Sequence, residues 1–563
     1  MASRISSGLA CLLCFTLLGE MPAQSQSRRE ASHSGSQQQS LSRDVIRELN
    51  AKMTEQQQQI EQLRSALEEQ KKLLHEILRL QASAPNAPSP QLPRLGEVAS
   101  AAAMIPAPAA TAALAPQNEP QSAELPSPLQ FQLGSASFTP VGFMDLTGSF
   151  RSTNAGTGIG TNFGSIPFSD TSAGKLSEIR LSTQNSRVGL RVDATAAGAN
   201  VLGYLEADFL GVVPANAAVS SNSDTLRLRQ YWVDVRKGRW EVLGGQSWSM
   251  LTPNRKGLSP LPSDLFSTQN IDVNYQAGLV WQRTSNIRMI YHPTDKLAAG
   301  LSLENPEQYI GGSAGGGLVV LPTAFQSNNY FNQLNNGNTS LAVPGFHPDI
   351  IAKIAYDTKT SWGTDFHLEA AGVARTFRLY NPLNNTHYST TGGGGSVNLN
   401  FDLVKNFRFL TNNYWSDGGG REIFGQAPDL IVRGDGSASA IHSGSTVTGF
   451  EATAGNSQVA FYYGGIYVQR NTAVDPATGR LVGYGYPSSP SGQNRTIQEL
   501  TFDWNHTYWK DAKFGALNLM FQYSYLFRKP WSVAAGQPQD AHFHMVMLNL
   551  RYTLPGSAPT IKH

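Results

Sequence analysis

The sequence has little cysteine, little charge and no long apolar run, and each shortage excludes a class of protein. The only two cysteines, Cys11 and Cys14, lie within residues 1–23, which excludes disulfides and thiol chemistry in the rest of the chain. Charged residues make up 15% of the chain and the net charge is +2, so we expect no nucleic-acid partner. No stretch supplies the roughly 18 apolar residues of a transmembrane helix.

Motifs of enzymes and of metal or cofactor sites are also missing. The sequence has no nucleophile elbow, no phosphate loop and no paired CxxC. His542 and His544 lie two apart and share a strand face, but no further ligand stands nearby, so we expect no metal and no cofactor. A lipase built on a membrane barrel would need a Ser, a His and a polar partner close together near one rim of that barrel. No pattern in the sequence supports such a group. We therefore expect no catalytic residues and no enzymatic activity.

What the chain has in abundance is glycine (53 residues), aromatic side chains (9%) and strict alternation of apolar and polar residues. The alternation is clearest over residues 177–248, where Ile179 and Leu181 point to one face and Glu178 and Arg180 to the other. This period of two is that of a β-strand with two different faces.

A soluble β-sandwich and a transmembrane β-barrel both use such strands. A sandwich strand usually has about 5–6 residues, whereas most of the expected strands are longer. The strands also continue without a helix over residues 137–554, and a soluble core of that size would split into domains. A transmembrane barrel turns its apolar side chains to lipid and its charged ones to a wet lumen. The sequence therefore predicts an all-β transmembrane barrel of about 16 antiparallel strands.

The number of expected strands is even, as in bacterial barrels. They cover residues 137–151, 175–194, 200–212, 225–237, 239–249, 277–291, 296–304, 349–359, 363–380, 392–404, 406–418, 444–455, 457–470, 494–510, 512–529 and 539–554. Short connections at one end alternate with long loops at the other, the asymmetry typical of such barrels. The roles of the loops 305–348 and 419–443 are left open.

The N-terminal part divides into segments of different composition. Residues 1–23 have the basic start, apolar middle and small-residue end of a signal peptide, and their apolar run is too short for a membrane anchor. Residues 24–40 are Ser/Gln-rich and expected to be disordered, 41–81 to form an α-helical coiled coil, and 82–130 to be a Pro/Ala-rich linker. The barrel domain is expected over 131–556, followed by a C-terminal tail, 557–563.

The coiled-coil prediction depends on a heptad pattern, with Gln56 and Gln70 at two of its core positions. The apolar core positions are Ile46, Leu49, Met53, Ile60, Leu63, Leu67, Leu74 and Ile77. The pattern favours self-association without deciding between dimer and trimer. The alternative is a single amphipathic helix that packs on another element.

Several segments resemble a known family. SRVGLRVDA, GYLEADFLG, LRLRQYWVDV and GGQSWS, in this order, resemble the second to fifth strands of Gram-negative general porins. GLSLENPEQ at 300–308, with the coiled coil and Pro-rich linker, resembles DcaP-like porins. The resemblance implies a sixteen-stranded homotrimer in the bacterial outer membrane, with the coiled coil in the periplasm. It also implies a third external loop folded into the lumen and diffusion of small, often anionic solutes.

Charged residues on the inward face are the candidates for the solute path. They are Arg180, Arg187, Arg191, Glu206, Asp208, Arg227 and Arg229. An excess of guanidinium groups favours carboxylates, which arginine binds with two hydrogen bonds. The expected partners are thus outer-membrane lipid, further copies of the chain, and small anionic or neutral solutes such as dicarboxylates. The alternative is that these charges pair with one another on neighbouring strands.

The stretch 250–276 is the candidate for a constriction loop, which would narrow the lumen. The alternative is an ordinary external loop. Its charged residues are Arg255, Lys256, Asp264 and Asp272. Two other functions stay open. One is a structural outer-membrane protein whose coiled coil spaces or tethers the envelope. The other is a phosphate-selective channel, which would line its lumen with a ladder of Lys or Arg, whereas the inward residues here mix both signs.

Overall fold

The computed structural model describes residues 127–211, 225–265, 268–336 and 342–556. The expected signal peptide, disordered stretch, coiled coil, most of the linker and the C-terminal tail lie outside the described residues. Those predictions stay predictions, together with the eight apolar core positions of the heptad.

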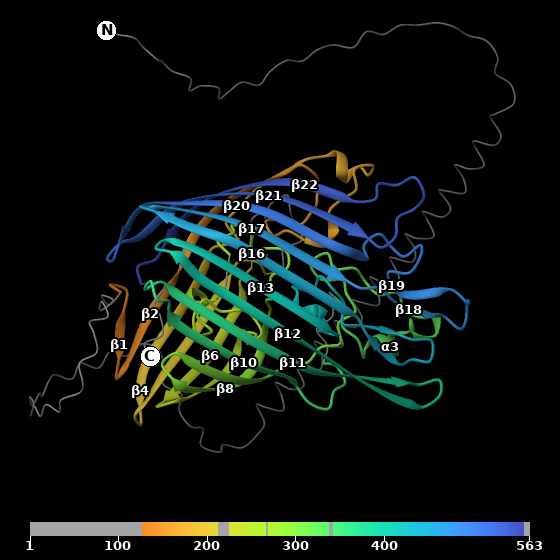
Figure 1. Ribbon diagram of the computed structural model, residues 1–563, viewed down its shortest axis with the longest axis horizontal. Helices are drawn as coiled ribbons and strands as arrows, with labels where there is room; N and C mark the ends of the chain where they lie inside the picture. Colours follow the sequence, from red (N-terminus) through yellow and green to blue (C-terminus); the bar gives the residue numbers. More distant parts are fainter. Residues whose placement is uncertain (1–126, 212–224, 266–267, 337–341, 557–563) are drawn as a thin grey trace, which may run out of the picture. The chain divides into compact units, whose positions relative to one another are not determined.

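The described chain forms one large antiparallel sheet that closes on itself, because the first long strand, β2, pairs with the last, β22. Figure 1 shows β10 to β13, β16, β17 and β20 to β22 side by side in the wall. The strands of the sheet are β1 (Phe131–Leu133), β2 (Ala136–Arg151), β3 (Glu178–Ser182), β4 (Arg187–Ala196), β5 (Ala199–Asp208), β6 (Arg227–Lys237), β7 (Trp240–Trp248), β8 (Arg283–Thr294), β9 (Leu297–Glu304), β10 (Asp349–Lys359), β11 (Asp365–Asn381), β12 (Thr386–Val404), β13 (Phe407–Asp417), β16 (His442–Ala454), β17 (Ser457–Val468), β20 (Asn494–Asp511), β21 (Gly515–Pro530) and β22 (Ala541–Thr553).

These 18 strands make a closed wall of sixteen positions. β3 and β4 both pair with β2 and count as one position, and β1 only adds three residues beside β2. The predicted barrel of about 16 antiparallel strands is therefore confirmed. Every strand of the wall except the short β1 overlaps one of the sixteen expected ranges.

Two expected strands differ from the observed ones. The range 175–194 is broken at residues 183–186, where the Ser186 amide donates to the Thr183 carbonyl in a turn. The Ser186 hydroxyl accepts a bond from the Asp145 amide of β2, which stabilises this break. The range 277–291 becomes a strand only at Arg283, because residues 277–282 still belong to a loop inside the barrel.

Alternation divides the wall into two faces, as the sequence indicates. Ile179 and Leu181 are 79% and 68% exposed, whereas the intervening inward groups of the wall are buried or half-buried. Figure 1 also shows β1 at one end and the β18–β19 hairpin at the other. Short turns join strands at the first end and long loops at the second.

The long loops contain structure that periodicity did not predict. They carry two hairpins, a short helix and five 3-10 turns: β14 (Leu430–Val432) with β15 (Ala438–Ala440), β18 (Asn471–Val474) with β19 (Leu481–Tyr484), α3 (Asn328–Phe331), η1 (Phe163–Ser165), η2 (Ala173–Lys175), η3 (Pro262–Asp264), η4 (Thr323–Phe325) and η5 (Gly420–Glu422). In the described ranges no helix has the length and apolarity that would carry it across a membrane.

A dry core fills the long-loop end of the barrel. Ile310, Phe325 and Ile431 from the loops pack on inward strand residues such as Phe377 and Phe543. We expected a wet lumen throughout, and this end differs because the loops need an apolar surface to pack on. The lumen is therefore occupied by folded loops at this end.

Candidate functional site

An arginine-rich wall is built by β4, β5 and β6. A bulge in the β5–β6 pairing lies between Glu206 and Ala207, so β6 carries one extra residue there. As a result Arg229 and Gln230 are both buried on the inner face, at 2% and 0% exposure. Leu228, which directly precedes Arg229 in β6, is half exposed on the outer face.

The charges of this wall form a continuous network. The Arg227 guanidinium donates to both oxygens of Asp208, at 3.0 and 2.7 Å. The Arg229 guanidinium donates to Asp208 at 2.7 Å and to Glu206 at 2.7 Å. The Tyr204 hydroxyl donates to the second oxygen of Glu206 at 3.2 Å. Arg229 therefore acts as the buried centre of the network, while the Arg227 side chain is 39% exposed.

The other three predicted arginines are held differently. Arg180 donates to the Gln184 side chain at 3.1 Å, and Arg191 forms an ion pair with Asp193 at 2.7 Å. Arg187 lies 3.6 Å from Glu206, a long ion pair, and its guanidinium lies over the Phe143 ring. Of the predicted set, Arg187 is the residue that lines an open cavity.

The loop between β7 and β8, residues 249–282, crosses the lumen. Its first half is fastened to β10 and β11: Lys353 donates to the Thr252 carbonyl at 2.8 Å, and Glu369 accepts from the Asn254 amide at 3.2 Å. Lys353 and Glu369 also pair with each other at 2.9 Å, both fully buried. A buried ion pair that also bonds backbone groups fixes the loop's position strongly.

The second half of the loop is fastened to the far side of the barrel. The Gln522 side chain on β21 accepts from the Ile271 amide at 2.7 Å, and Glu499 on β20 accepts from the Ala277 amide at 2.8 Å. Tyr275 has a φ of 61°, a left-handed conformation that is disfavoured for a residue with a side chain. Such strain occurs where the surrounding structure imposes it, often at functional sites.

The four predicted charges of this loop fall in different places. Arg255 reaches across to Glu451 on β16, at 2.6 Å, whereas Lys256 is exposed and Asp264 is half-buried. Asp272 is buried, and it accepts from the Thr161 amide at 3.2 Å. Burial raises the pKa of the Asp272 carboxyl.

A cavity of about 150 Å³ lies between this loop and the arginine-rich wall. Phe143, Arg187 and Arg551 line it on the wall side, and the Arg551 guanidinium lies 4.1 Å from the centre of the Phe143 ring. Trp248 and Trp281 line it from the two ends of the loop, 5.4 Å apart between ring centres. The cavity thus offers aromatic faces beside guanidinium groups.

Several buried polar atoms at this cavity have no hydrogen-bond partner among the described residues. The donors are Arg187 Nε, Trp248 Nε1 and Trp281 Nε1, and the acceptors or hydroxyls are Thr252 Oγ1, Thr268 Oγ1, Gln269 Oε1, Asn270 Oδ1 and Asp272 Oδ2. Buried polar atoms are normally hydrogen-bonded, so their concentration here favours water or a polar solute as their partner. This is the candidate functional site.

The facing wall is acidic. Counted from β2, β6 is the fourth and β16 the twelfth position of the closed wall, so the two stand opposite each other. Glu451 on β16 and Glu499 and Asp503 on β20 are buried on the inner face. Both oxygens of Asp503 are without a hydrogen bond to any described residue. The inner face of this wall therefore presents buried carboxyl groups opposite the arginines of the first wall.

Metal binding gains no support at the predicted histidine pair. His542 and His544 are outward neighbours of Tyr525, and the His544 ring nitrogen bonds the Tyr523 hydroxyl at 2.8 Å. Within the described ranges no three His, Cys, Asp or Glu residues gather where they would hold a metal ion.

Sequence reasoning missed part of the site. Arg551 and Phe143 are in the last and first long strands, and only barrel closure brings them beside Arg187. Trp248 and Trp281 flank the loop, and their aromatic character at the loop ends was the one signal that pointed to them.

No protein-family model matches the chain, and no curated protein sequence is similar to it. Among solved structures, the outer-membrane channel DcaP of Acinetobacter baumannii is similar, with a TM-score of 0.54 and 16% identity over 75% of this chain and 99% of that one. Pseudomonas putida OprB matches with a TM-score of 0.42 and 11% identity, over 74% and 94% of the two chains. Salmonella typhi OmpF matches with a TM-score of 0.42 and 8% identity, over 75% and 99%. The described chain therefore has the barrel fold that the DcaP channel also has.

Proposed function

We propose that the protein is an outer-membrane porin through which small hydrophilic solutes diffuse, with a preference for small organic anions such as dicarboxylates. The observation that carries this proposal is the cavity beside Arg187, where unpartnered donors and two guanidinium groups face a crossing loop. Guanidinium groups bind carboxylates with short charge-assisted hydrogen bonds. The closed wall and its apolar outer face support a location in the outer membrane.

Arg187 is the residue that meets the solute most directly in this proposal. Arg551 lines the same cavity while its guanidinium is paired with Asp145 at 2.8 Å. Arg229 acts as a positioning residue, because its guanidinium is buried and already bonded to Glu206 and Asp208. Loop-filled space at the long-loop end restricts the path to small solutes.

We further propose that three copies associate and that residues 41–81 form a coiled coil in the periplasm. Removal of residues 24–81 should leave the conductance of each channel nearly unchanged and lower the heat stability of the oligomer on gels. Loss of all conductance in that variant would contradict the proposal.

The direct test is the reversal potential of the channel in a planar bilayer under a salt gradient. The wild-type channel should prefer anions, and Arg187→Gln should reduce that preference by a factor of about two to ten, as for loss of one partly screened charge. Arg187→Lys is the matched control, because it keeps the charge. A cation preference of the wild type, or no conductance at all, would contradict the proposal and favour a structural role.

A further inference from the structure

The outer face of the wall at β13, β16, β17 and β20 has a hollow of about 740 Å³ near the long-loop end. Pairing places outward residues in rows across the strands. One row consists of Gly395, Trp415, Gly444, Tyr467 and Thr496, in which each residue pairs with the next. Glycine at two of these positions leaves the space between the aromatic side chains empty.

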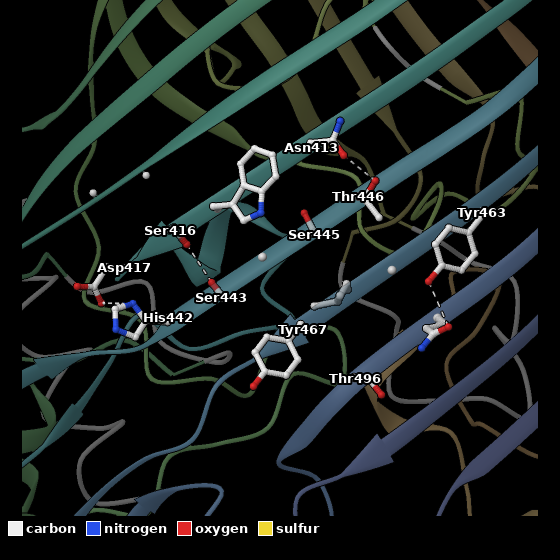
Figure 2. A pocket seen from close by; sticks show the side chains of 17 residues that line it. Asn413, Ser416, Asp417, His442, Ser443, Ser445, Thr446, Tyr463, Tyr467 and Thr496 are labelled. Carbon is white, nitrogen blue, oxygen red and sulfur yellow. Dashed lines mark hydrogen bonds and ion pairs between the residues drawn. The ribbon is translucent and has the colours of Figure 1, made fainter.

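The next row toward the short-turn end is polar. It consists of Val397, Asn413, Thr446, Gly465 and Gln498. In Figure 2 the Asn413 and Thr446 side chains meet, and Thr446 donates to Asn413 at 3.0 Å. The Tyr463 hydroxyl donates to Gln498 at 3.2 Å. These cross-strand bonds satisfy polar groups on a face where lipid is expected.

A row of phenylalanines lies nearer the short-turn end of the same wall. Its members are Phe401, Phe409, Phe450, Phe461 and Phe502, paired in this order. Phe409 and Trp415 are six residues apart on β13, about 20 Å along the strand. Aromatic girdles flank the apolar band of a membrane barrel, about 25 Å tall. The hollow therefore lies at the girdle next to the long loops.

A second hollow of about 580 Å³ adjoins the first, because Asp417 and His442 line both. Figure 2 shows these two side chains next to each other, and they form an ion pair at 3.3 Å. Arg433 and Arg470 are the other charged residues that line this hollow, and both are exposed.

The two arginines are positioned by neutral groups. The Arg433 guanidinium donates to the Ser439 hydroxyl at 3.0 Å, and the Arg470 guanidinium lies 4.4 Å from the centre of the Trp531 ring. Neither forms an ion pair with a carboxylate of the described residues. Arg433 interacts electrostatically with the nearby Asp435, but no carboxylate holds either guanidinium in an ion pair within the described ranges. Two exposed guanidinium groups of this kind, beside a hollow whose other charged residues are the paired Asp417 and His442, complement an amphiphile with an anionic head.

We infer that this face binds a phosphate-bearing lipid of the outer leaflet, with an acyl chain beside Gly444 and phosphate at Arg433 and Arg470. The inference goes beyond the proposed solute path, though it rests on the barrel's location in the outer membrane. Arginine is suited to phosphate because its planar fork donates two parallel hydrogen bonds. Aromatic side chains at the girdle pack against the lipid where head and chain meet.

Native mass spectrometry of the full-length, delipidated protein tests the inference, with bisphosphorylated lipid A as the probe. Arg433→Gln together with Arg470→Gln should weaken binding by about tenfold or more, the loss expected for charge-assisted contacts. Gly444→Leu should weaken it as well, because the side chain fills the acyl hollow. Arg239→Gln is the matched control, since this exposed arginine lies in the short turn between β6 and β7.

A dephosphorylated lipid A separates head recognition from adhesion of the acyl chains. It should bind the wild type as weakly as the double arginine variant binds the phosphorylated lipid, and the double variant should not distinguish the two lipids. Equal binding of both lipids to the wild type would overturn the inference. Efficient disulfide cross-linking between copies through Asn413→Cys in membranes would also overturn it, because a second copy would then cover this face. Conductance of the same samples is measured separately. Failure of the channel proposal is therefore distinguishable from failure of the lipid-binding inference.

Discussion

On the wall of β5 and β6, the Arg227 and Arg229 guanidinium groups meet Glu206 and Asp208 within 3.0 Å, whereas on the facing wall the Asp503 carboxylate bonds no described residue. The first wall therefore carries its charges as a paired network, whereas the second contains a buried carboxyl group without a described hydrogen-bond partner. The loop 249–282 bridges them and uses Glu451 and Glu499 of the second wall as attachment points.

The difference teaches that charge in this lumen has two separate roles. Paired charges hold the wall or the loop, and substituting one of them leaves its buried partner uncompensated. In the proposed channel, groups with spare hydrogen-bonding capacity are the ones that act on solutes. The following predictions divide the two roles, from the largest expected effect to the smallest.

Arg229→Ala should have the largest effect on stability. It leaves Glu206 and Asp208 buried with fewer counter-charges, which costs about 3–5 kcal/mol for a broken buried pair. Arg227→Ala is the matched control, with a loss below about 1–2 kcal/mol because its side chain is 39% exposed. Thermal unfolding of both variants in detergent checks the comparison, and equal losses would contradict it.

The stability of the loop 418–441 should depend on pH through Glu422. Burial raises the pKa of Glu422 to about 7, so folding favours its protonated form. The stabilisation is complete below the unfolded pKa of about 4.3 and is lost as the pH rises through the folded pKa, a total of about 4 kcal/mol. Glu422→Gln should remove most of this dependence. Thermal unfolding at about pH 5 and about pH 8 measures this pH dependence of stability. An unchanged dependence in the variant would mean that groups other than Glu422 cause it.

Glu451→Gln should loosen the loop and strengthen anion preference together. Arg255 loses its 2.6 Å partner while Lys353 and Glu369 still hold the first half of the loop. We expect a loss of about 1–3 kcal/mol, as for a buried acceptor of a charged donor, and a higher single-channel conductance. A lower conductance would mean that the loop moves into the path instead.

Asp503→Asn should have the smallest effect on stability, within about 1 kcal/mol, because no described partner is lost. It removes a negative charge from the facing wall, so the reversal potential should shift slightly toward anions. An unchanged reversal potential would show that Asp503 does not act on the path.

Much of the wall was predictable from the sequence, because a period of two with lipid on one side leaves few alternatives. All sixteen strand positions, and the shared outward direction of Ile179 and Leu181, agree with the prediction. The packing of the long-loop end was not predictable from the sequence. Loop residues such as Phe325 and Ile431 form a core with distant strands, and no periodicity marks them.

The candidate site was predictable only in part. Alternation places Arg187 inward, but the choice between a paired and a solute-facing arginine depends on cross-strand distances. Arg551 reaches Arg187 through barrel closure, and the bulge at Arg229 turns Gln230 inward against the alternation. The coiled-coil and linker predictions still await a structure of those residues.

The most direct test of the central claim is uptake into liposomes that contain the purified full-length protein. The rates for a small dicarboxylate and for a neutral solute of similar size are compared in the wild type, in Arg187→Gln and in Arg187→Lys. The arginine-lined cavity predicts faster dicarboxylate uptake in the wild type, a selective loss of that advantage in Arg187→Gln, and its retention in Arg187→Lys. Equal slowing of both solutes in Arg187→Gln, or no change in either, would contradict the claim that this cavity selects anions.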